Sequence, residues 1–343
     1  MAKVRKAASN KVQLSGIDHA VRIVDRICLV TGSIDFTNEL QVGGSRLRRI
    51  LDRRDNVGLF NWLVEAFSHQ GVSDQLADGY MRRNGRLTWA DVSAGVAPDV
   101  VCPKLNSFWQ FEDCRYSKST GLCAEPQFRP SCELPNAVLR NGRLNQLAYS
   151  LFLFIRDVAD GDLIGWIDER LRHEAANSDD RIAVGRAAII EPLRSVYGVA
   201  DKVLMMAFAD LLMSAPARYP GWFEVGAAMI AVDTLVHAFL ARTGVLQRLG
   251  HEHPYGPACY QKHGCAAVIR TVAGHLDCRK YNPAFPANFP RFVQHAIWHY
   301  CAQSGMDVCN GNRIDDRQRC RNKGCDVYSI CSRKSLKSLF KLQ

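Results

Sequence analysis

Four cysteines near the C-terminus constrain the fold more than any other feature of the sequence. Cys309, Cys320, Cys325 and Cys331 follow a predicted helix over residues 291–303, with the spacing C-x10-C-x4-C-x5-C. The surrounding segment is short and polar, so it buries little else. Four thiolates on one compact loop are typical of an iron–sulfur cluster, and zinc accepts four thiolates equally well. The spacing therefore predicts a metal-tied C-terminal loop, with unrelated buried cysteines as the alternative.

Charge and cysteine content indicate the compartment and the class of partner. The chain has 343 residues, 13 cysteines and a formal net charge of +10. It has no apolar run long enough for a membrane span, and residues 1–12 form a basic arm without the apolar stretch of a signal peptide. We therefore expect a reducing, cytoplasmic location, where clustered cysteines bind metal more often than they form disulfides. The positive charge favours nucleic acid as partner, with a merely solvated basic surface as the alternative.

Apolar residues recur at helical spacing through most of the chain, and no segment shows the alternation of apolar and polar residues that is typical of a strand. The sequence therefore predicts an all-α fold. Residues 98–135 differ, being rich in proline, cysteine and aromatic residues, and we interpret them as an inserted loop region. The predicted helices cover residues 18–31, 59–82 with a break near Gly71, 144–157, 162–175, 181–193, 197–212, 227–242 and 291–303.

Three segments carry more specific information than periodicity. Residues 197–203 read Y-G-V-A-D-K-V, where glycine permits a sharp turn and a close approach of backbone N–H groups to a phosphate. Residues 231–236 read A-V-D-T-L-V. Residues 63–74 contain a predicted helix break, which follows Gln70. Together with the C-terminal cysteines, they resemble the helix-hairpin-helix, iron–sulfur DNA glycosylases, the superfamily of endonuclease III and adenine glycosylase.

The resemblance rests on four motifs that occur in the family's order. Residues 63–74 are similar to the family's L-L-S-A-Q-A-T-D turn, residues 197–203 to its L-P-G-V-G-x-K hairpin, and residues 231–236 to its V-D-T-H-V segment. The cysteines resemble the family's C-x6-C-x2-C-x5-C loop, of which only the last interval is the same here.

The resemblance implies a role for each matched residue. Asp233 is the catalytic carboxylate, which stabilises positive charge on the deoxyribose, and Lys202 is the amine that attacks C1′ in members with lyase activity. Gln70 fills the gap left in the duplex by a flipped base. Gly198 and Ala200 belong to the hairpin that contacts a DNA phosphate. Without the resemblance, Asp233 is a helix cap, Lys202 a surface or phosphate-binding lysine, and Gln70 an exposed side chain.

The chain departs from the family pattern at several positions. Tyr197 replaces the hairpin proline, Ala200 replaces its second glycine, and Leu235 replaces the histidine that follows the aspartate–threonine pair. Asp201 adds a negative charge beside the proposed phosphate site. These differences weaken the assignment of DNA binding to the hairpin and of lyase activity to Lys202 more than they weaken the assignment of Asp233 as the catalytic carboxylate.

Further groups of charged and metal-ligating residues surround these motifs. Basic residues of the cysteine loop that suit phosphate contacts, or a solvated rim, are Arg313, Arg317, Arg319, Arg321 and Lys323. A possible second metal site in the insertion, for which plain buried thiols are the favoured interpretation, comprises Cys102, Cys114, Cys123 and Cys132. A looser collection, interpreted as scattered side chains rather than ligands, comprises His251, His253, Cys259, His263, Cys265, His275 and Cys278.

We therefore predict an all-α, two-domain, monomeric protein with the helix-hairpin-helix glycosylase fold. Residues 59–215 form a domain resembling a six-helix barrel, which carries the hairpin and the insertion. Residues 14–58 join 216–343 in a second domain with a [4Fe-4S] cluster. Double-stranded DNA with a damaged or mismatched base would lie across a basic cleft between them. The expected activity is base excision with lyase activity, and the alternatives are a monofunctional glycosylase or a non-catalytic iron–sulfur lesion sensor.

Overall fold

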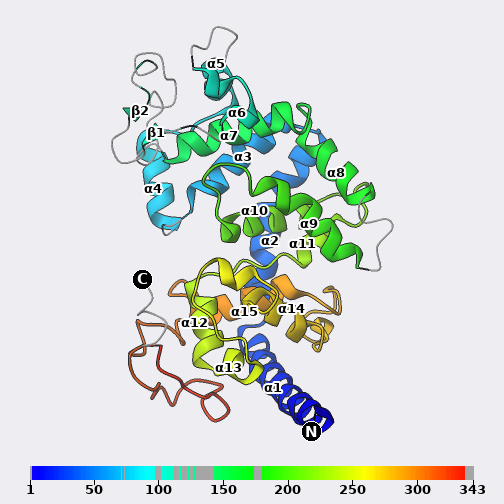
Figure 1. Ribbon diagram of the computed structural model, residues 1–343, viewed down its shortest axis with the longest axis vertical. Coiled ribbons are helices and arrows are strands. Elements are labelled where there is room, and N and C mark those ends of the chain that lie inside the picture. The colour runs from blue at the N-terminus through cyan, green and yellow to red at the C-terminus, as the bar shows by residue number, and fades with distance from the viewer. Residues whose placement is uncertain are drawn as a thin grey trace. The chain divides into compact units, whose positions relative to one another are not determined.

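The computed structural model is built almost entirely of helices, which confirms the all-α prediction (Figure 1). It forms two compact units: residues 1–42 with 227–343 are unit 1, and residues 43–226 are unit 2. The predicted domain boundaries, at residues 59 and 215, both fall inside unit 2. The structure describes residues 2–70, 72, 74–96, 102–111, 114, 116–117, 122–123, 125, 127, 143–173 and 180–336.

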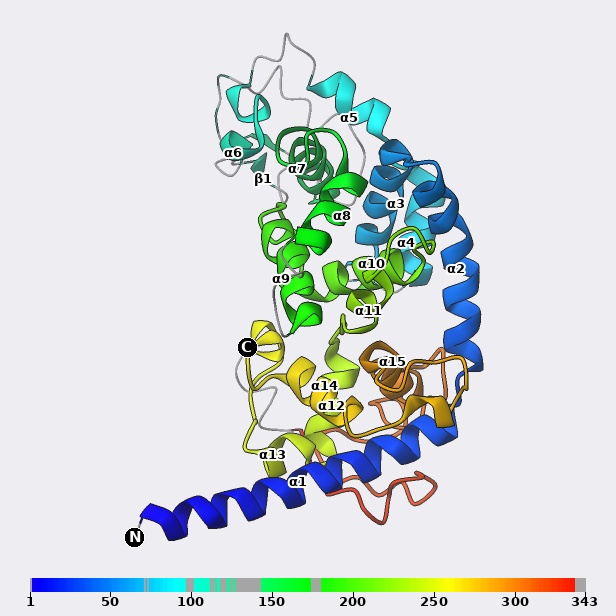
Figure 2. The same ribbon diagram turned by 90° about the vertical axis from the view of Figure 1, so that its right-hand side faces the viewer.

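Unit 1 gathers helices around a core rich in aromatic residues. Its elements are α1 (Ala2–Thr31), the first part of α2 (Ile34–Asp52), α12 (Thr234–Arg242), α13 (Val245–Leu249), η5 (Pro257–Tyr260), α14 (Cys265–Ala273), η6 (Cys278–Lys280) and α15 (Pro290–Cys301). The long α1 packs against α13, α14 and α15 (Figure 2). In the core, Phe36 meets Phe285, Phe289 and Phe292 edge-on, the arrangement that the aromatic quadrupole favours.

Unit 2 begins within α2 and contains the remaining helices. They are α3 (Asn56–Ser68), α4 (Asp74–Asn84), α5 (Trp89–Gly95), η1 (Pro103–Leu105), α6 (Phe108–Phe111), α7 (Arg143–Asp157), α8 (Leu163–His173), α9 (Arg181–Leu193), α10 (Asp201–Met213) and α11 (Trp222–Ala227). The apolar face of α3 packs against α7 and α10, and α8 packs against α9. The fully buried Trp222 donates a hydrogen bond from Nε1 to Asp168, so its polar end is satisfied in the core.

The insertion contains a short strand pair that the periodicity did not predict. Strands β1 (Tyr116–Ser117) and β2 (Leu122–Cys123) pair antiparallel, with Tyr116 opposite Cys123. The expectation of no strand is wrong here, because two residues are too few for alternation to register.

Two predicted boundaries also need correction. The basic arm over residues 1–12 is part of α1, since its alanine and lysine residues favour a helix and no glycine or proline interrupts them before Gly16. The helix predicted over residues 227–242 begins only at Thr234. The segment 229–233 before it is non-helical and mostly buried, and a continuous apolar run is compatible with either conformation.

Candidate functional site

Asp233 lies in unit 1 as the N-cap of α12. Its side chain accepts a hydrogen bond from the Val236 backbone N–H at 2.9 Å. The residue before it is fixed by a tyrosine: the Tyr260 hydroxyl accepts from the Val232 N–H at 2.9 Å and donates to the Val232 carbonyl at 3.3 Å. Burial, and then the negative charge of Asp233, raise the pKa of Tyr255. The half-buried Asp233 is therefore fixed twice: its carboxylate is held by the Val236 N–H, and the backbone just before it is held by Tyr260.

The predicted hairpin lies in unit 2 between α9 and α10. Gly198 has φ +74°, a conformation that other residues rarely adopt, and it turns the chain between the two helices. Lys202 is the second residue of α10 and is half-buried. The charge of Asp201 is paired, because its Oδ1 accepts from Arg194 Nε at 2.7 Å. A turn thus joins two helices at the predicted position, and Lys202 belongs to unit 2 whereas Asp233 belongs to unit 1.

Gln70 contacts the hairpin directly. Its Nε2 donates to the Gly198 carbonyl at 2.7 Å, and its Oε1 accepts from the Ala200 N–H at 2.8 Å. Gln70 is only 7 % exposed, whereas Gly198 and Ala200 are exposed. In this arrangement the glutamine side chain braces the hairpin, and it occupies a backbone N–H that was expected to face a phosphate.

We expect Gln70→Ala to lower the free energy of unfolding by about 1–2 kcal/mol, because it removes two hydrogen bonds from the hairpin. Urea unfolding measures the effect, and Gln75→Ala, at an exposed position of α4, is the matched control. Unchanged stability together with reduced base excision would instead indicate that Gln70 acts on DNA.

The four C-terminal cysteines lie in the loop that follows α15, and polar groups contact the sulfurs of Cys309, Cys325 and Cys331. Among the described residues these cysteines do not form a group that could hold a metal ion. The fully buried Arg242 of α12 donates from Nη1 to Cys309 Sγ at 3.2 Å and pairs with Asp316. The Tyr300 hydroxyl donates to Cys325 Sγ at 3.3 Å. Burial, and then the charges of the other three thiols, raise the pKa of Cys331 to about 11.

Cys309 behaves differently from the other loop cysteines. A hydrogen bond from Cys301 lowers its pKa, burial opposes this, and the Arg242 charge lowers it further, to about 7. The pKa of Cys309 is therefore lowered whereas those of Cys325 and Cys331 are raised, and a metal ligand must be deprotonated.

The other predicted side chains are placed as follows. The basic residues of the loop, all exposed, are Arg313, Arg317, Arg319, Arg321 and Lys323. In the insertion, burial above all raises the pKa of Cys114, and the charges of Cys102 and Cys123 raise it further. Among the described residues these three cysteines do not form a group that could hold a metal ion. Cys132 lies outside the described residues.

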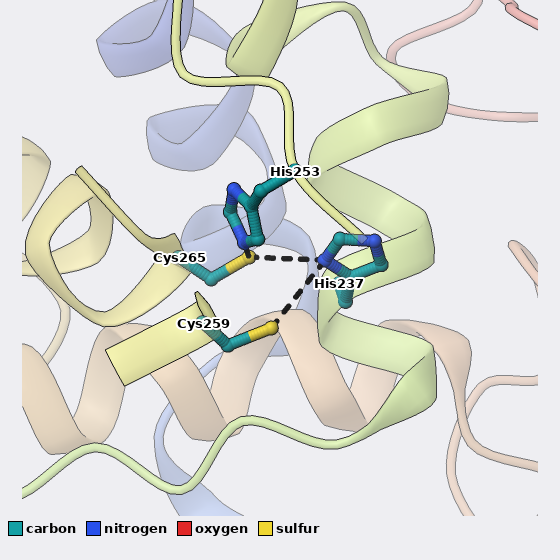
Figure 3. A group of neighbouring side chains, drawn as sticks. All are labelled: His237, His253, Cys259 and Cys265. Atoms are coloured by element: carbon teal, nitrogen blue, oxygen red, sulfur yellow. Dashed lines mark hydrogen bonds between the residues drawn. The ribbon is translucent and has the colours of Figure 1, made fainter. Parts of the chain in front are cut away.

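A group of metal-ligating side chains lies in unit 1 and corrects the interpretation of the histidines and cysteines of residues 251–278 as scattered. His253, Cys259 and Cys265 of that collection come together with His237, which the sequence did not indicate. His237, His253, Cys259 and Cys265 have their ligand atoms within 4.8 Å of one another, and among the described residues they are the group that could hold a metal ion (Figure 3). His237 Nδ1 lies 3.3 Å from Cys265 Sγ and 3.6 Å from Cys259 Sγ. His253 Nε2 lies 3.4 Å from Cys265 Sγ. We call these four residues the Cys2His2 group.

Three elements and a loop build the Cys2His2 group. His237 projects from α12, one turn after Asp233, His253 comes from the loop after α13, Cys259 from η5, and Cys265 begins α14. A hydrogen bond from Cys265, together with weaker contributions from His237 and His253, lowers the pKa of Cys259 to about 3. The same contact, followed by burial, raises the pKa of Cys265.

Comparisons with known proteins give no match: no family model, no curated protein and no solved structure is similar to this chain. The residues and their geometry therefore carry the assignment of function. None of the described helices is both long enough and apolar enough to cross a membrane.

Proposed function

We propose that this protein is a DNA base-excision glycosylase of the helix-hairpin-helix type, which flips and removes a damaged or mismatched base. The observation that carries the proposal is the fixed Asp233 carboxylate at the start of α12, in a segment that resembles the catalytic segment of that family. The helix–turn–helix formed by α9 and α10, with Gly198 at the turn, supports it. DNA with a single altered base is the proposed partner.

The chemistry of base removal explains why a carboxylate is needed. As the bond between C1′ and the base breaks, the bonding electrons leave with the base and positive charge develops on the sugar. A preorganised carboxylate such as Asp233 stabilises that charge more strongly than water does, because it needs no reorientation. The base must leave the stack first, since the duplex shields C1′.

In the proposed lyase reaction Lys202 is the nucleophile at C1′. Its amine bonds to C1′ as the base departs with a proton. The C1′–O4′ bond of the sugar ring then opens, the amine gives up a proton to the ring oxygen, and an imine remains. Removal of a C2′ proton then breaks the C3′–O bond and nicks the strand. In the monofunctional alternative, water attacks C1′ and Lys202 only contacts DNA.

Under this proposal, a [4Fe-4S] cluster is held by the cysteines of the C-terminal loop: Cys309, Cys320, Cys325 and Cys331. The loop supplies four thiols of the right donor chemistry, and Arg242 and the Tyr300 hydroxyl donate to two of their sulfurs, bonds that stabilise thiolates. In the structure these four described cysteines are not drawn together as a group that could hold a metal ion, so binding would require the loop to close around the cluster. When bound, the cluster crosslinks the loop. The arginines and the lysine of the loop are exposed and would be available to bind DNA phosphates.

Borohydride trapping tests both steps in one experiment. Duplexes that each carry one altered base are incubated with the protein and sodium borohydride, which reduces an imine to a stable adduct. We expect a covalent protein–DNA adduct with at least one lesion, with peptide mapping that places it on Lys202, and with no adduct for Lys202→Gln.

The matched control is Lys262→Gln, an exposed lysine of unit 1, which should trap as the unaltered protein does. Base release without an adduct would favour the monofunctional enzyme. An adduct mapped to another residue would show that the lyase assignment to Lys202 is wrong.

A further inference from the structure

We propose that the Cys2His2 group is a structural zinc site, separate from the cysteine loop at the C-terminus. This inference is independent of the proposed glycosylase activity, because it rests on the geometry of His237, His253, Cys259 and Cys265 alone.

The spacing of the ligand atoms suits one tetrahedral ion. With Zn–S near 2.3 Å and Zn–N near 2.0–2.1 Å, neighbouring ligand atoms in a tetrahedron are about 3.3–3.8 Å apart. The three separations between histidine nitrogens and cysteine sulfurs in the group are 3.3, 3.4 and 3.6 Å. All four ligand atoms face a common centre (Figure 3).

The protonation of His253 is also that of a metal ligand. Its Nδ1 lies 2.7 Å from the backbone carbonyl of His251. A carbonyl oxygen only accepts, so Nδ1 carries the proton and the lone pair of Nε2 points toward Cys265. This hydrogen bond to a carbonyl is the usual second contact of a zinc-bound histidine, and it fixes both the tautomer and the ring orientation.

The donor set and the burial select zinc in a structural role. Two thiolates and two imidazoles suit zinc, whereas magnesium and calcium take oxygen ligands and a cubane cluster takes four thiolates. Cys259 and Cys265 are fully buried, His237 is 3 % exposed and His253 is half-buried, so four protein ligands can fill the coordination of the ion, as in structural sites. Both sulfurs bind Zn²⁺ as thiolates, so any thiol proton is released when the two Zn–S bonds form.

The site would fasten α12 to the segment between α13 and α14. That segment, residues 250–264, contains a single short 3-10 helix and otherwise irregular chain, so it has few hydrogen bonds of its own. Gly264 allows the two thiols to approach: a Cβ there would lie 2.3 Å from the Ala258 carbonyl oxygen and 2.4 Å from that of Cys259. Because His237 lies one turn after Asp233, zinc would also hold the start of α12.

The test measures metal content and metal environment in the full chain. Zinc and iron are quantified by mass spectrometry after purification without chelators, and X-ray absorption at the zinc edge gives the ligand shell. We expect one zinc per chain, with two sulfur ligands at about 2.3 Å and two nitrogen ligands at about 2.0 Å. Cys259→Ser and Cys265→Ser should each lower bound zinc by at least about tenfold without lowering iron.

Two controls keep the result interpretable. Cys278→Ala, a buried cysteine of unit 1 outside the group, should retain zinc. Where a ligand variant fails to fold, the unaltered protein exchanged with Co²⁺ gives a second measurement, since tetrahedral cobalt with two thiolates absorbs strongly in the visible range.

The proposal fails if the unaltered protein neither contains zinc nor takes it up from a zinc buffer. It also fails if the zinc shell contains four sulfurs, which would place the ion in the C-terminal loop, or if Cys259 and Cys265 are isolated as a disulfide.

Discussion

Asp233→Asn should lose base excision almost completely while the protein remains folded. Asparagine keeps a side-chain oxygen that can accept from the Val236 N–H, so the cap of α12 survives. The negative charge that stabilises the sugar cation is lost, and we expect the rate of excision to fall by about a thousandfold. Single-turnover release of the base, measured beside thermal unfolding, separates the two effects.

Two further variants make the comparison specific. Asp233→Ala removes cap and charge together, and should cost about 1 kcal/mol of stability in addition to the activity. Asp55→Asn alters the equivalent cap of α3, where the carboxylate accepts from the Gly58 N–H at 2.8 Å, and should leave excision unchanged. Excision by Asp233→Asn at the normal rate would remove this residue from the mechanism. Lesion binding without excision by the unaltered protein is what the lesion-sensor alternative predicts.

Arg242→Met should destabilise the protein by about 2–3 kcal/mol, because it deletes the buried cation that donates charge-assisted hydrogen bonds to Asp316, whose side chain is 28 % exposed, and to Cys309. The Arg242 side chain is 3 % exposed, pairs with Asp316 and donates to Cys309 Sγ. Burial opposes its charge, yet Cys309 and Asp316 raise the pKa of Arg242. Its removal leaves both negative partners without their cation, so we also expect less iron per chain.

Denaturant unfolding and iron analysis measure the Arg242 effect. Arg248→Met, at an exposed position of the neighbouring α13, is the control and should change stability by no more than about 0.5 kcal/mol. If Arg242→Met is as stable as the unaltered protein, the pair with Asp316 does not hold the cysteine loop to α12.

Local sequence patterns predicted the helices where one face is apolar and a cap is present. The segment over residues 181–193 was predicted and found as α9, since Asp180 caps it and its apolar residues recur at helical spacing. The segment 229–233 was predicted as helix and is not, because burial of most of its residues removes the periodicity that distinguishes the two conformations. The paired strands of the insertion were too short for any pattern.

The site was less predictable than the helices, because it depends on contacts between distant residues. The sequence identified Asp233 by its motif, but nothing in it links Gln70 to the backbone of Gly198 and Ala200, more than a hundred residues away. The Cys2His2 group has the spacing H-x15-H-x5-C-x5-C, with its first histidine inside an apolar helix. Such spacing matches no compact motif, and only the packing of α12 and η5 against α14 brings the ligands together. The two equal x5 intervals, in a stretch rich in proline and glycine, were the one available indication.

The release of a free base is the measurement that bears most directly on the proposed enzyme. Purified protein with its metals bound is incubated with a panel of duplexes, each with one altered or mispaired base, and the liberated bases are identified by mass spectrometry. We predict that at least one altered base is liberated while unmodified DNA stays intact. A metal-loaded, folded protein that binds these duplexes and liberates no base from any of them would contradict the assignment.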